Sequence, residues 1–557
     1  MKNSADILQS IIENEARKIK ESFKGDNYFA VQNIVRRLDV FSSFSGGKKV
    51  TREVGELFNF GWSNAIRPFF AELNLQTSHP FVEITQQDIA WADSAILFAG
   101  KLAFCKQIIE YEKAGFLEIV SPTTSEFGFR YLNPSVGIEY FERASADFFR
   151  ENIVKKIIEE KKAKTKYDEK SIHKQLKSII RNPYGKYISY NTTNDIDEYY
   201  NQKGHYHMLL LQGYDNFNTK DTFGSIAYWK YVDLIELIIG VAHMHRDACI
   251  ELVRRNRNVD MHNVLSYNWF KDKTVKTYSD YLDVPVEEIE QIISCLTLSS
   301  QNYEYYMDYP SVPPPIYFQT SNNQLIRSVA GCMGNPIRLL NSELKRKFTK
   351  DYDEAVNRRE DRFRRELFMF FPDQRIVKIP REINISFDGI KTDIDAVVYD
   401  TTTRSLGLFQ LKWQDPFAQS MQERRSRISN LFPKANEWID KMRIWTQSFD
   451  VKTILNALQI TKYAPNARAV DNIYVFVIAR NHIHFTGVKT NETVAWGSWY
   501  QIIESQAMVK ANFDDPIKEM FVKLKMYSPE LRIEREELPI RLNVDLKFGE
   551  YRIFNYE

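Results

Sequence analysis

Four polar side chains stand near the ends of two neighbouring apolar segments in KTDIDAVVYDTTTRSLGLFQLKW, residues 391–413. A turn over DTTTRS joins these segments into an antiparallel hairpin in which Asp395 faces Gln410. The next pair on the same face is Asp393 with Lys412, and Cβ atoms of opposed residues lie about 4.5–5.5 Å apart. The spacing therefore predicts a small polar cluster at one end of the hairpin.

The two faces of this hairpin differ because side chains alternate along each strand. One face is apolar throughout and is predicted to belong to a core: Ile394, Ala396, Val398, Gly407, Phe409, Leu411 and Trp413. The other face is polar only at its far end, and its apolar members are Val397, Tyr399, Leu406 and Leu408. A hairpin that faces solvent is polar along its whole length. The polar cluster is therefore expected on an otherwise buried sheet.

Metal-dependent chemistry on phosphates fits these residue types. Burying charged groups without partners costs several kcal/mol each, so the cluster requires a compensating ion. Mg²⁺ or Mn²⁺ suits it, because hard cations prefer carboxylate, amide and main-chain oxygens. A metal at Asp395 lowers the pKa of a bound water and polarises a phosphoryl oxygen, while Lys412 positions the water or stabilises transition-state charge. The alternative is two Asp–Lys ion pairs on an exposed hairpin, worth about 0–1 kcal/mol.

This segment resembles the catalytic core of the PD-(D/E)XK, or restriction-endonuclease-like, nuclease superfamily. The hallmark of that superfamily is an Asp near the start of one strand and a (D/E)-x-K motif on the paired strand. TDIDAVV places Asp395 at the first position, and Gln410, Leu411 and Lys412 stand at the second. The Q-x-K form is similar to that of Mrr-type restriction endonucleases. Gln in place of an acid removes one negative charge, which lowers metal affinity or makes it depend on another carboxylate.

The resemblance covers roughly residues 340–505. It implies an α/β nuclease core, in which a mixed sheet is flanked by helices. It also implies that Asp395 is the principal metal ligand, that Gln410 and the Leu411 carbonyl complete the shell, and that Lys412 is the water-positioning cation. The implied reaction is hydrolysis of DNA phosphodiester bonds by metal-activated water, without a covalent intermediate.

A further carboxylate is expected upstream, because several branches of the superfamily carry a Glu in a helical E-x-x-Φ-x-x-x-Φ pattern, Φ being apolar. Glu360 and the apolar residues three and seven positions later fit this pattern in REDRFRREL. Glu366 and Glu382 are alternative candidates. The other interpretation of this segment is ion pairing between helix-surface residues four positions apart.

Arginines flank the predicted site in the sequence. Arg362 precedes it, and Arg424, Arg425 and Arg427 follow it. Arg and Lys make most protein contacts to nucleic-acid phosphates, so these residues are candidates for a DNA backbone channel. RNA stays open as a substrate. Cutting both strands with a single-site nuclease usually requires two copies, so a homo-oligomer is one expectation.

Hydrophobic patterning divides the chain into four parts. Residues 1–310 are dominated by helical spacing and form a large, mainly α-helical N-terminal region. Around 90–135 a helix followed by a hairpin pattern indicates a small α+β packing unit or, alternatively, a winged-helix-like unit. Three consecutive prolines predict a linker at 311–324, because proline fixes an extended backbone. Strand-like and helical segments alternate over 325–505, the predicted nuclease domain, and 506–557 are expected to form an α/β extension.

Composition excludes several other classes of protein. The 557 residues contain 75 Lys and Arg against 73 Asp and Glu, so the formal charge is +2 and any nucleic-acid surface must be local. Four scattered cysteines without a CxxC pair argue against a disulfide framework or zinc ribbon. The N-terminus lacks the apolar run of a signal peptide, and Asp233 and Glu236 interrupt the most apolar helical segment. A cytoplasmic protein without membrane contact is expected.

The expected function is that of a Mg²⁺-dependent endodeoxyribonuclease whose helical region selects substrate, senses a trigger or mediates oligomerisation. By analogy, the size of that region favours restriction, phage defence or repair. One alternative is a catalytically inactive nucleic-acid-binding or scaffold protein that keeps the nuclease fold. Another is a sensor whose N-terminal region binds a small molecule or a protein.

Overall fold

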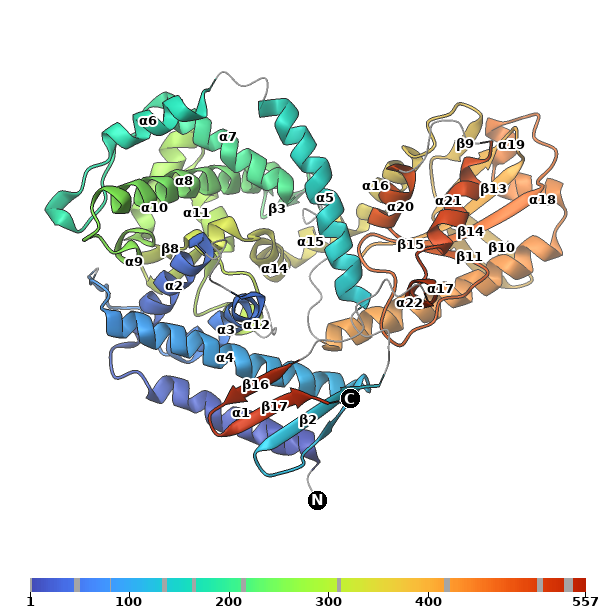
Figure 1. The fold of residues 1–557 in the computed structure, drawn as a ribbon. Coiled ribbons are helices and arrows are strands. Elements are labelled where there is room, and N and C mark those ends of the chain that lie inside the picture. The colour runs from blue at the N-terminus through green and yellow to red at the C-terminus, as the bar shows by residue number, and fades with distance from the viewer. Residues whose placement is uncertain are drawn as a thin grey trace. The chain divides into compact units, whose positions relative to one another are not determined.

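The computed structural model describes residues 3–44, 51–80, 82–132, 138–162, 167–211, 217–307, 312–414, 421–507, 514–534 and 544–556. The chain divides into two compact units, each built from segments far apart in sequence. Unit 1 comprises Met1–Arg130, Val154–Ala355 and Asn543–Glu557, and unit 2 comprises Tyr131–Ile153 and Val356–Leu542. Helix α5 (Ile138–Lys162) has residues in both units (Figure 1).

Unit 1 is mainly helical. Its longer helices are α1 (Ser4–Glu21), α2 (Asn27–Phe44), α3 (Arg52–Phe70), α4 (Gln86–Lys113), α6 (Glu169–Ile179), α7 (Asn194–Leu210), α8 (Tyr228–Arg255), α10 (Lys271–Leu282), α11 (Val286–Cys295), α14 (Ile337–Lys347) and α15 (Thr349–Asn357). Its short helices are α9 (Met261–Val264), α12 (Tyr303–Met307), α13 (Val329–Met333) and the 3₁₀ turn η1 (Pro183–Gly185). Its strands are β1 (Leu117–Val120), β2 (Glu126–Tyr131), β3 (Thr222–Phe223), β4 (Ile226–Ala227), β5 (Tyr267–Phe270), β6 (Thr297–Leu298), β7 (Tyr317–Ser321), β8 (Gln324–Arg327), β16 (Asp545–Phe548) and β17 (Tyr551–Asn555).

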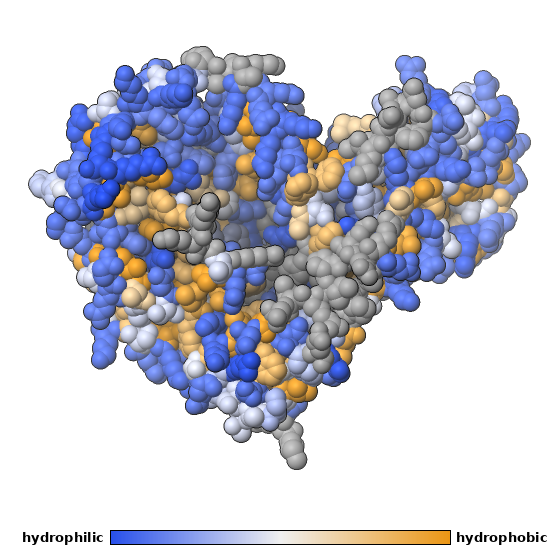
Figure 2. Space-filling view, viewed as in Figure 1, coloured by the Kyte–Doolittle hydropathy of each residue, from blue (hydrophilic) through white to orange (hydrophobic). Residues whose placement is uncertain are grey.

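Local sequence explains where these helices begin and how closely they pack. Helix α4 starts at a capping box in which Thr85 and Asp88 satisfy each other's main-chain N–H groups. Helices α3 and α4 approach so closely that a Cβ at Gly61 would lie 1.9 Å from the carbonyl oxygen of Ile96. The helices can pack at this distance because glycine has no Cβ. Helix α6 turns its apolar residues inward, and polar residues dominate its outer surface (Figure 2).

Two sheets of unit 1 correct the predicted domain boundaries. The expected linker at 311–324, which the structure describes from residue 312 onward, contains β7. This strand pairs with β8 in the sheet of order β5-β8-β7-β6, and the units divide near residue 355 instead.

The sheet of order β1-β2-β17-β16 follows α4, so helix and hairpin occur in the predicted winged-helix order. However, β17 joins that sheet parallel to β2. The segment 506–557 is therefore not one extension, because it is divided between the two units.

Unit 2 combines one five-stranded mixed sheet, a two-stranded hairpin and helices. Its helices are α16 (Arg359–Phe368), α17 (Met421–Ser448), α18 (Val451–Ala457), α19 (Ile460–Tyr463), α20 (Trp499–Ala507), α21 (Pro516–Lys525) and α22 (Pro529–Glu534). Its strands are β9 (Ile376–Ile379), β10 (Ile383–Phe387), β11 (Ile390–Ile394), β12 (Ala396–Asp400), β13 (Ser405–Lys412), β14 (Asn472–Ala479) and β15 (Ala495–Ser498). The predicted combination of a mixed α/β core with a largely helical region is confirmed at this level.

The five-stranded sheet has the order β15-β14-β13-β12-β9. Strand β12 runs antiparallel to both β9 and β13, whereas β13, β14 and β15 are parallel to one another. Helices α17 to α19 cover one face and α16, α20 and α21 cover the other, each over its own hydrophobic core. Both faces of β12 and β13 are therefore buried.

The predicted hairpin register is confirmed over β12 and β13. Ala396 pairs with Phe409 and Tyr399 with Leu406, in the register that places Asp395 opposite Gln410. The prediction is wrong beyond Asp395, because the chain bends there and β11 pairs with β10 instead, with Asp393 opposite Asn384.

The bend also moves Ile394 to the other side of the sheet. It lies in the core beneath α17, together with Val397, and not with Ala396 and Val398 as the strict alternation predicts. A bend between two ladders breaks the period of two on which that prediction rests.

None of the helices in the described ranges combines the length and apolar character needed to cross a bilayer.

Candidate metal centre

Asp395 occupies the bend between β11 and β12, and hydrogen bonds fix both its main chain and its side chain. Its main-chain N–H donates to the Phe409 carbonyl at 3.1 Å, which continues the β12–β13 ladder by one bond. Its Oδ2 accepts the Leu411 N–H at 2.6 Å and the Gln410 Nε2–H at 2.5 Å. The side chain is buried, with 3% of the residue exposed. Asp395 is therefore fixed at the end of the sheet in one orientation.

Burial raises the pKa of Asp395 to about 6. The positive charge of Lys412 and the hydrogen bonds from Leu411 and Gln410 oppose this rise, while the charge of Asp393 adds to it. Desolvation dominates, because water is excluded from a charge that the hydrogen bonds satisfy only in part. A cation close to Asp395 would favour its ionised form.

Two further carboxylates lie beside Asp395. Oxygen atoms of Glu360, Glu382 and Asp395 all lie within 4.8 Å of one another, and no other such group of His, Cys, Asp and Glu is present in the described ranges. Glu360 comes from α16 and Glu382 from the residue before β10. Partial desolvation raises the pKa of Glu360, with Lys412 opposing and Glu382 adding to the rise. Three carboxylates this close repel one another and match the oxygen ligands that Mg²⁺ or Mn²⁺ requires.

Lys412 ends β13 beside these carboxylates. Its carbonyl accepts the Arg480 N–H at 2.9 Å, so the segment that follows β14 fixes its backbone. Its side chain is half-buried, and its charge lowers the pKa of both Asp395 and Glu360. Among the described residues it forms no ion pair. A cation that is close to the carboxylates but not bound to them can still act on a substrate phosphate.

Gln410 and Leu411 both donate hydrogen bonds to Asp395. Gln410 donates its amide N–H to Asp395 and so orients the carboxylate, while its side-chain oxygen as a metal ligand stays a prediction. Leu411 donates its main-chain N–H to the same oxygen. Its carbonyl as a metal ligand stays a prediction.

The predicted alternatives to Glu360 separate clearly. Glu382 belongs to the carboxylate cluster. Glu366 instead accepts from Arg480 and, at 2.9 Å, from Arg362. Glu366 and Glu360 lie on different sides of α16, because they are six positions apart on a helix. Glu366 therefore meets Arg480 and not the carboxylate cluster.

Two buried arginines, Arg364 and Arg480, support the centre, and this role was not predicted for either of them. Arg364, 3% exposed, donates to the main-chain carbonyl of Asp395 and, at 2.6 Å, to Asp361. Arg480 pairs with Glu366 and lies 4.8 Å from the ring centre of Trp413. Helical spacing offered a signal for Arg364, because it stands three positions before the buried Leu367.

The predicted phosphate-binding arginines have varied surroundings. Arg362 pairs with Glu366, and Arg424 lies 3.5 Å from a carboxylate oxygen of Glu139. Arg425 is exposed and Arg427 is half-buried on α17. Their contact with nucleic acid stays a prediction.

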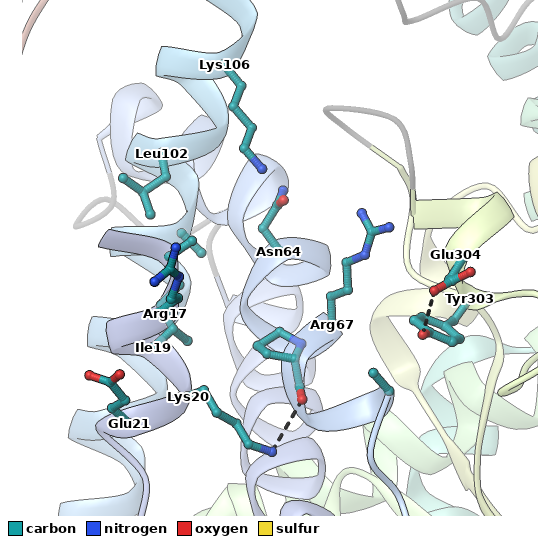
Figure 3. Close-up of a pocket in the computed structure, with 14 residues that line it drawn as sticks. Arg17, Ile19, Lys20, Glu21, Asn64, Arg67, Leu102, Lys106, Tyr303 and Glu304 are labelled. Atoms are coloured by element: carbon teal, nitrogen blue, oxygen red, sulfur yellow. Dashed lines mark hydrogen bonds between the residues drawn. The ribbon is translucent and has the colours of Figure 1, made fainter. Parts of the chain in front are cut away.

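A cavity of about 610 Å³ lies elsewhere, in unit 1 between α1, α3, α4 and α12. Apolar groups and charges of both signs line it, without a carboxylate cluster among its described residues. Figure 3 shows Lys20 directed at the Pro68 carbonyl and the Tyr303 hydroxyl bonded to Glu304. None of these residues belongs to the centre around Asp395.

Comparisons with protein-family models, with curated proteins and with solved structures find no match to this chain. Function is therefore inferred from the residues of the chain itself.

Proposed function

We propose that the protein is a metal-dependent nuclease that hydrolyses DNA phosphodiester bonds. The observation that carries this proposal is that oxygen atoms of Glu360, Glu382 and Asp395 lie within 4.8 Å of one another. Beside them lies Lys412, which forms no ion pair with any described carboxylate. A carboxylate cluster alone occurs in many proteins without a metal. A cluster with a buried Asp of raised pKa and an adjacent ammonium group matches what phosphodiester hydrolysis requires.

Glu360, Glu382 and Asp395 would hold Mg²⁺ or Mn²⁺, with the Leu411 carbonyl as a further oxygen. The bound metal supplies Lewis-acid activation of a water and of a phosphoryl oxygen. Gln410 and Arg364 keep Asp395 in place, the first through its side chain and the second through its carbonyl. Lys412 orients the attacking water or stabilises negative charge on the phosphorus-bound oxygens.

The topology of unit 2 supports the same proposal. A helix that carries Glu360, then antiparallel strands, then a helix and a parallel strand place the polar residues at one sheet end. This layout agrees with the one that the resemblance to the PD-(D/E)XK superfamily implies. Participation in restriction, phage defence or repair is proposed only by analogy with the large accessory unit.

Cleavage of plasmid, linear DNA and RNA in Mg²⁺, Mn²⁺ or EDTA tests the proposal. Glu360→Gln, Glu382→Gln, Asp395→Ala and Lys412→Ala should each lower the cleavage rate by about 10²-fold or more. Glu437→Gln, an exposed α17 position paired with Lys441, is the matched control and should cleave normally. Cleavage that survives both Asp395→Ala and Lys412→Ala would refute the site.

The second candidate is a nucleic-acid-binding protein without catalysis. The hydrogen bond from Gln410 to Asp395 favours it, because the amide occupies a carboxylate oxygen that a metal would otherwise use. DNA binding without cleavage in any metal, together with no metal-induced stabilisation, would select this candidate. Replacing Gln410 by Glu should then create metal binding.

A further inference from the structure

A second buried charge, Arg327, lies in unit 1 far along the chain from the carboxylate cluster. It ends strand β8 and is 8% exposed. Its Nε has no hydrogen-bond partner, and within the described ranges no carboxylate forms an ion pair with its guanidinium. An unpaired buried cation is costly, so a compensating group is expected.

No described carboxylate forms an ion pair with Arg327: the buried Asp39 accepts hydrogen bonds from Ser328 and Ala330, and none from Arg327. The electrostatic neighbours of Arg327 are Tyr190, Tyr278, Tyr317 and Cys332, which are phenols and a thiol. Burial raises the pKa of Tyr190 and Tyr317, and raises the pKa of Cys332 to about 12. These three groups are therefore neutral at physiological pH, and none of them compensates the charge of Arg327.

Aromatic side chains flank this cation in one row of the sheet. Arg327 pairs with Tyr267 of β5 on one side and with Tyr317 of β7 on the other. Its guanidinium lies 5.1 Å from the Tyr267 ring centre, and Trp269 stacks on Tyr267 at 5.4 Å and 26°. A cation–π contact offsets only part of the desolvation of a charge. The aromatic wall, Tyr267 and Trp269, reaches the surface, with Trp269 41% exposed.

Arg327 and this wall line a cavity of about 320 Å³. Helix α10 contributes Thr274, Thr277 and Tyr278 to its lining. The volume lies at the lower end of the range for small-molecule sites. Lys273 lies outside this lining, with its ammonium 5.2 Å from the Phe270 ring centre and 5.8 Å from the Trp269 ring centre.

The larger cavity in Figure 3 lacks this feature. Arg17, which lines it, is exposed, so water solvates its charge without a ligand. Arg67 is half-buried and Lys20 already pairs with Glu72 at 3.0 Å. The need for an anion is therefore stronger at Arg327.

We propose that the cavity at Arg327 binds a nucleoside monophosphate, with the phosphate on the buried guanidinium and the base stacked on the Tyr267–Trp269 wall. A phosphate monoester carries between one and two negative charges, which compensates the buried charge of Arg327. Base stacking on aromatic side chains is tolerant of sequence and is a common way to hold nucleotides. The same chemistry is available in a free mononucleotide and in the 5′-phosphorylated end of a nucleic acid. The proposal does not rest on the nuclease function of unit 2.

Calorimetric titration of the full chain with adenosine 5′-monophosphate tests this site. Saturable binding is expected, and both adenosine and inorganic phosphate should bind at least about 10-fold more weakly, since each lacks half of the contacts. Arg327→Met should lower affinity for the monophosphate at least about 10-fold. Arg17→Met, in the cavity of Figure 3, is the matched control and should bind as the wild type does.

A second pair of variants guards against misfolding at the buried position. Trp269→Leu should weaken binding at least about 5-fold, whereas Phe270→Leu, on the opposite face of the same strand and similarly exposed, should not. Thermal melting of Arg327→Met without ligand should match or exceed the wild type, because an unpaired charge has been removed. No saturable binding, equal binding of adenosine, or normal binding by Arg327→Met would each overturn the proposal.

The two sources of the ligand are separated with short oligonucleotides. A 5′-phosphorylated strand that binds better than the 5′-hydroxyl strand and competes with adenosine 5′-monophosphate identifies a nucleic-acid end as the ligand. Competition by the mononucleotide alone identifies a free nucleotide.

Discussion

At the scale of single residues, the chemistry around Asp395 depends on how its two carboxylate oxygens are used. One oxygen accepts from Leu411 and Gln410. The other, Oδ1, accepts no hydrogen bond from any described residue. Burial and two neighbouring acids disfavour the ionised form of the Asp395 carboxylate when no cation is bound. A cation that binds there relieves this cost, which contributes to its affinity.

Asp395→Asn is expected to stabilise the metal-free protein above neutral pH. Because burial raises the pKa of Asp395 to about 6, the stability due to its protonated form is complete below the ordinary Asp pKa and is lost as the pH rises through 6. The variant should therefore gain about 1–3 kcal/mol in the free energy of unfolding at pH 8 and little below about pH 4, measured by urea denaturation. Asp440→Asn, at an exposed α17 position, is the control. A loss of stability at pH 8 would contradict the argument.

Mn²⁺ binding should strengthen as the pH rises through about 6, because the metal competes with the Asp395 proton. Calorimetric titration with Mn²⁺ on either side of that pH measures the effect. Affinity should rise by up to about 10-fold per pH unit below the pKa and level off above it. Asp395→Asn should bind weakly at every pH, and a flat profile for the wild type would argue against Asp395 as a ligand.

Arg364→Met should destabilise the protein by about 1–3 kcal/mol, because it leaves the Asp395 carbonyl without its donor. It should also weaken Mn²⁺ binding, since the main chain of Asp395 is then less restrained. Arg365→Met is the control on the same helix, because Arg365 is exposed. Urea denaturation and Mn²⁺ titration of both variants provide the comparison, and equal behaviour would exclude a positioning role for Arg364.

At the scale of elements, the bend at Asp395 joins two ladders and is held by helix α17. The Trp438 indole N–H donates to the Asp393 carbonyl at 2.6 Å, just before the bend. The ring itself is buried in the core between α17 and the sheet. One helix therefore both covers the sheet and fixes the strand that enters the site.

Trp438→Phe keeps most of the buried area but removes this hydrogen bond. The free energy of unfolding should fall by about 1 kcal/mol more than in Trp445→Phe, whose ring lies in the same core. Mn²⁺ affinity should also fall in the Trp438 variant alone. Similar values for the two variants would show that packing, and not the bond to Asp393, determines the effect.

At the scale of the whole molecule, each unit depends on segments that lie far apart in the chain. Strand β17, near the C-terminus, pairs with β2 of unit 1, although the chain between 356 and 542 belongs to unit 2. Ile553 on β17 is fully buried. The C-terminal hairpin therefore stabilises the first unit and not the second.

Ile553→Asp should expose β1 and β2 while leaving the central sheet of unit 2 intact, because a charge is forced into the core of unit 1 alone. Hydrogen–deuterium exchange should show faster exchange in β1, β2 and β16 and unchanged protection in β13 and β14. Lys547→Gln, a change at an exposed position of the neighbouring strand β16, is the control and should keep wild-type exchange in β1 and β2. Equal loss of protection in both units would contradict the division of the chain.

At each of these scales, part of the result followed from sequence and part did not. The register of the β12–β13 hairpin and the Asp395–Gln410 pair were predicted correctly, because a short turn and strict alternation leave little freedom over so few residues. The bend at Asp395 was missed, because the partner of β11 is β10 and not β13. The prediction of a linker in the Pro-rich segment was wrong, since local rules cannot reveal that β7 is paired within a sheet.

The sequence by itself determined which residues can do chemistry and which of them meet across a tight turn, since these depend on side-chain type and on neighbours along the chain. Only the tertiary structure decided that Glu382 joins Glu360 and Asp395, that Glu366 pairs with Arg480, and that Arg364 is buried against the site. The physical reason is that these contacts join segments that are distant in the sequence. Their approach is set by the packing of α16 against the sheet and by the position of β14 within it, and no local periodicity encodes either.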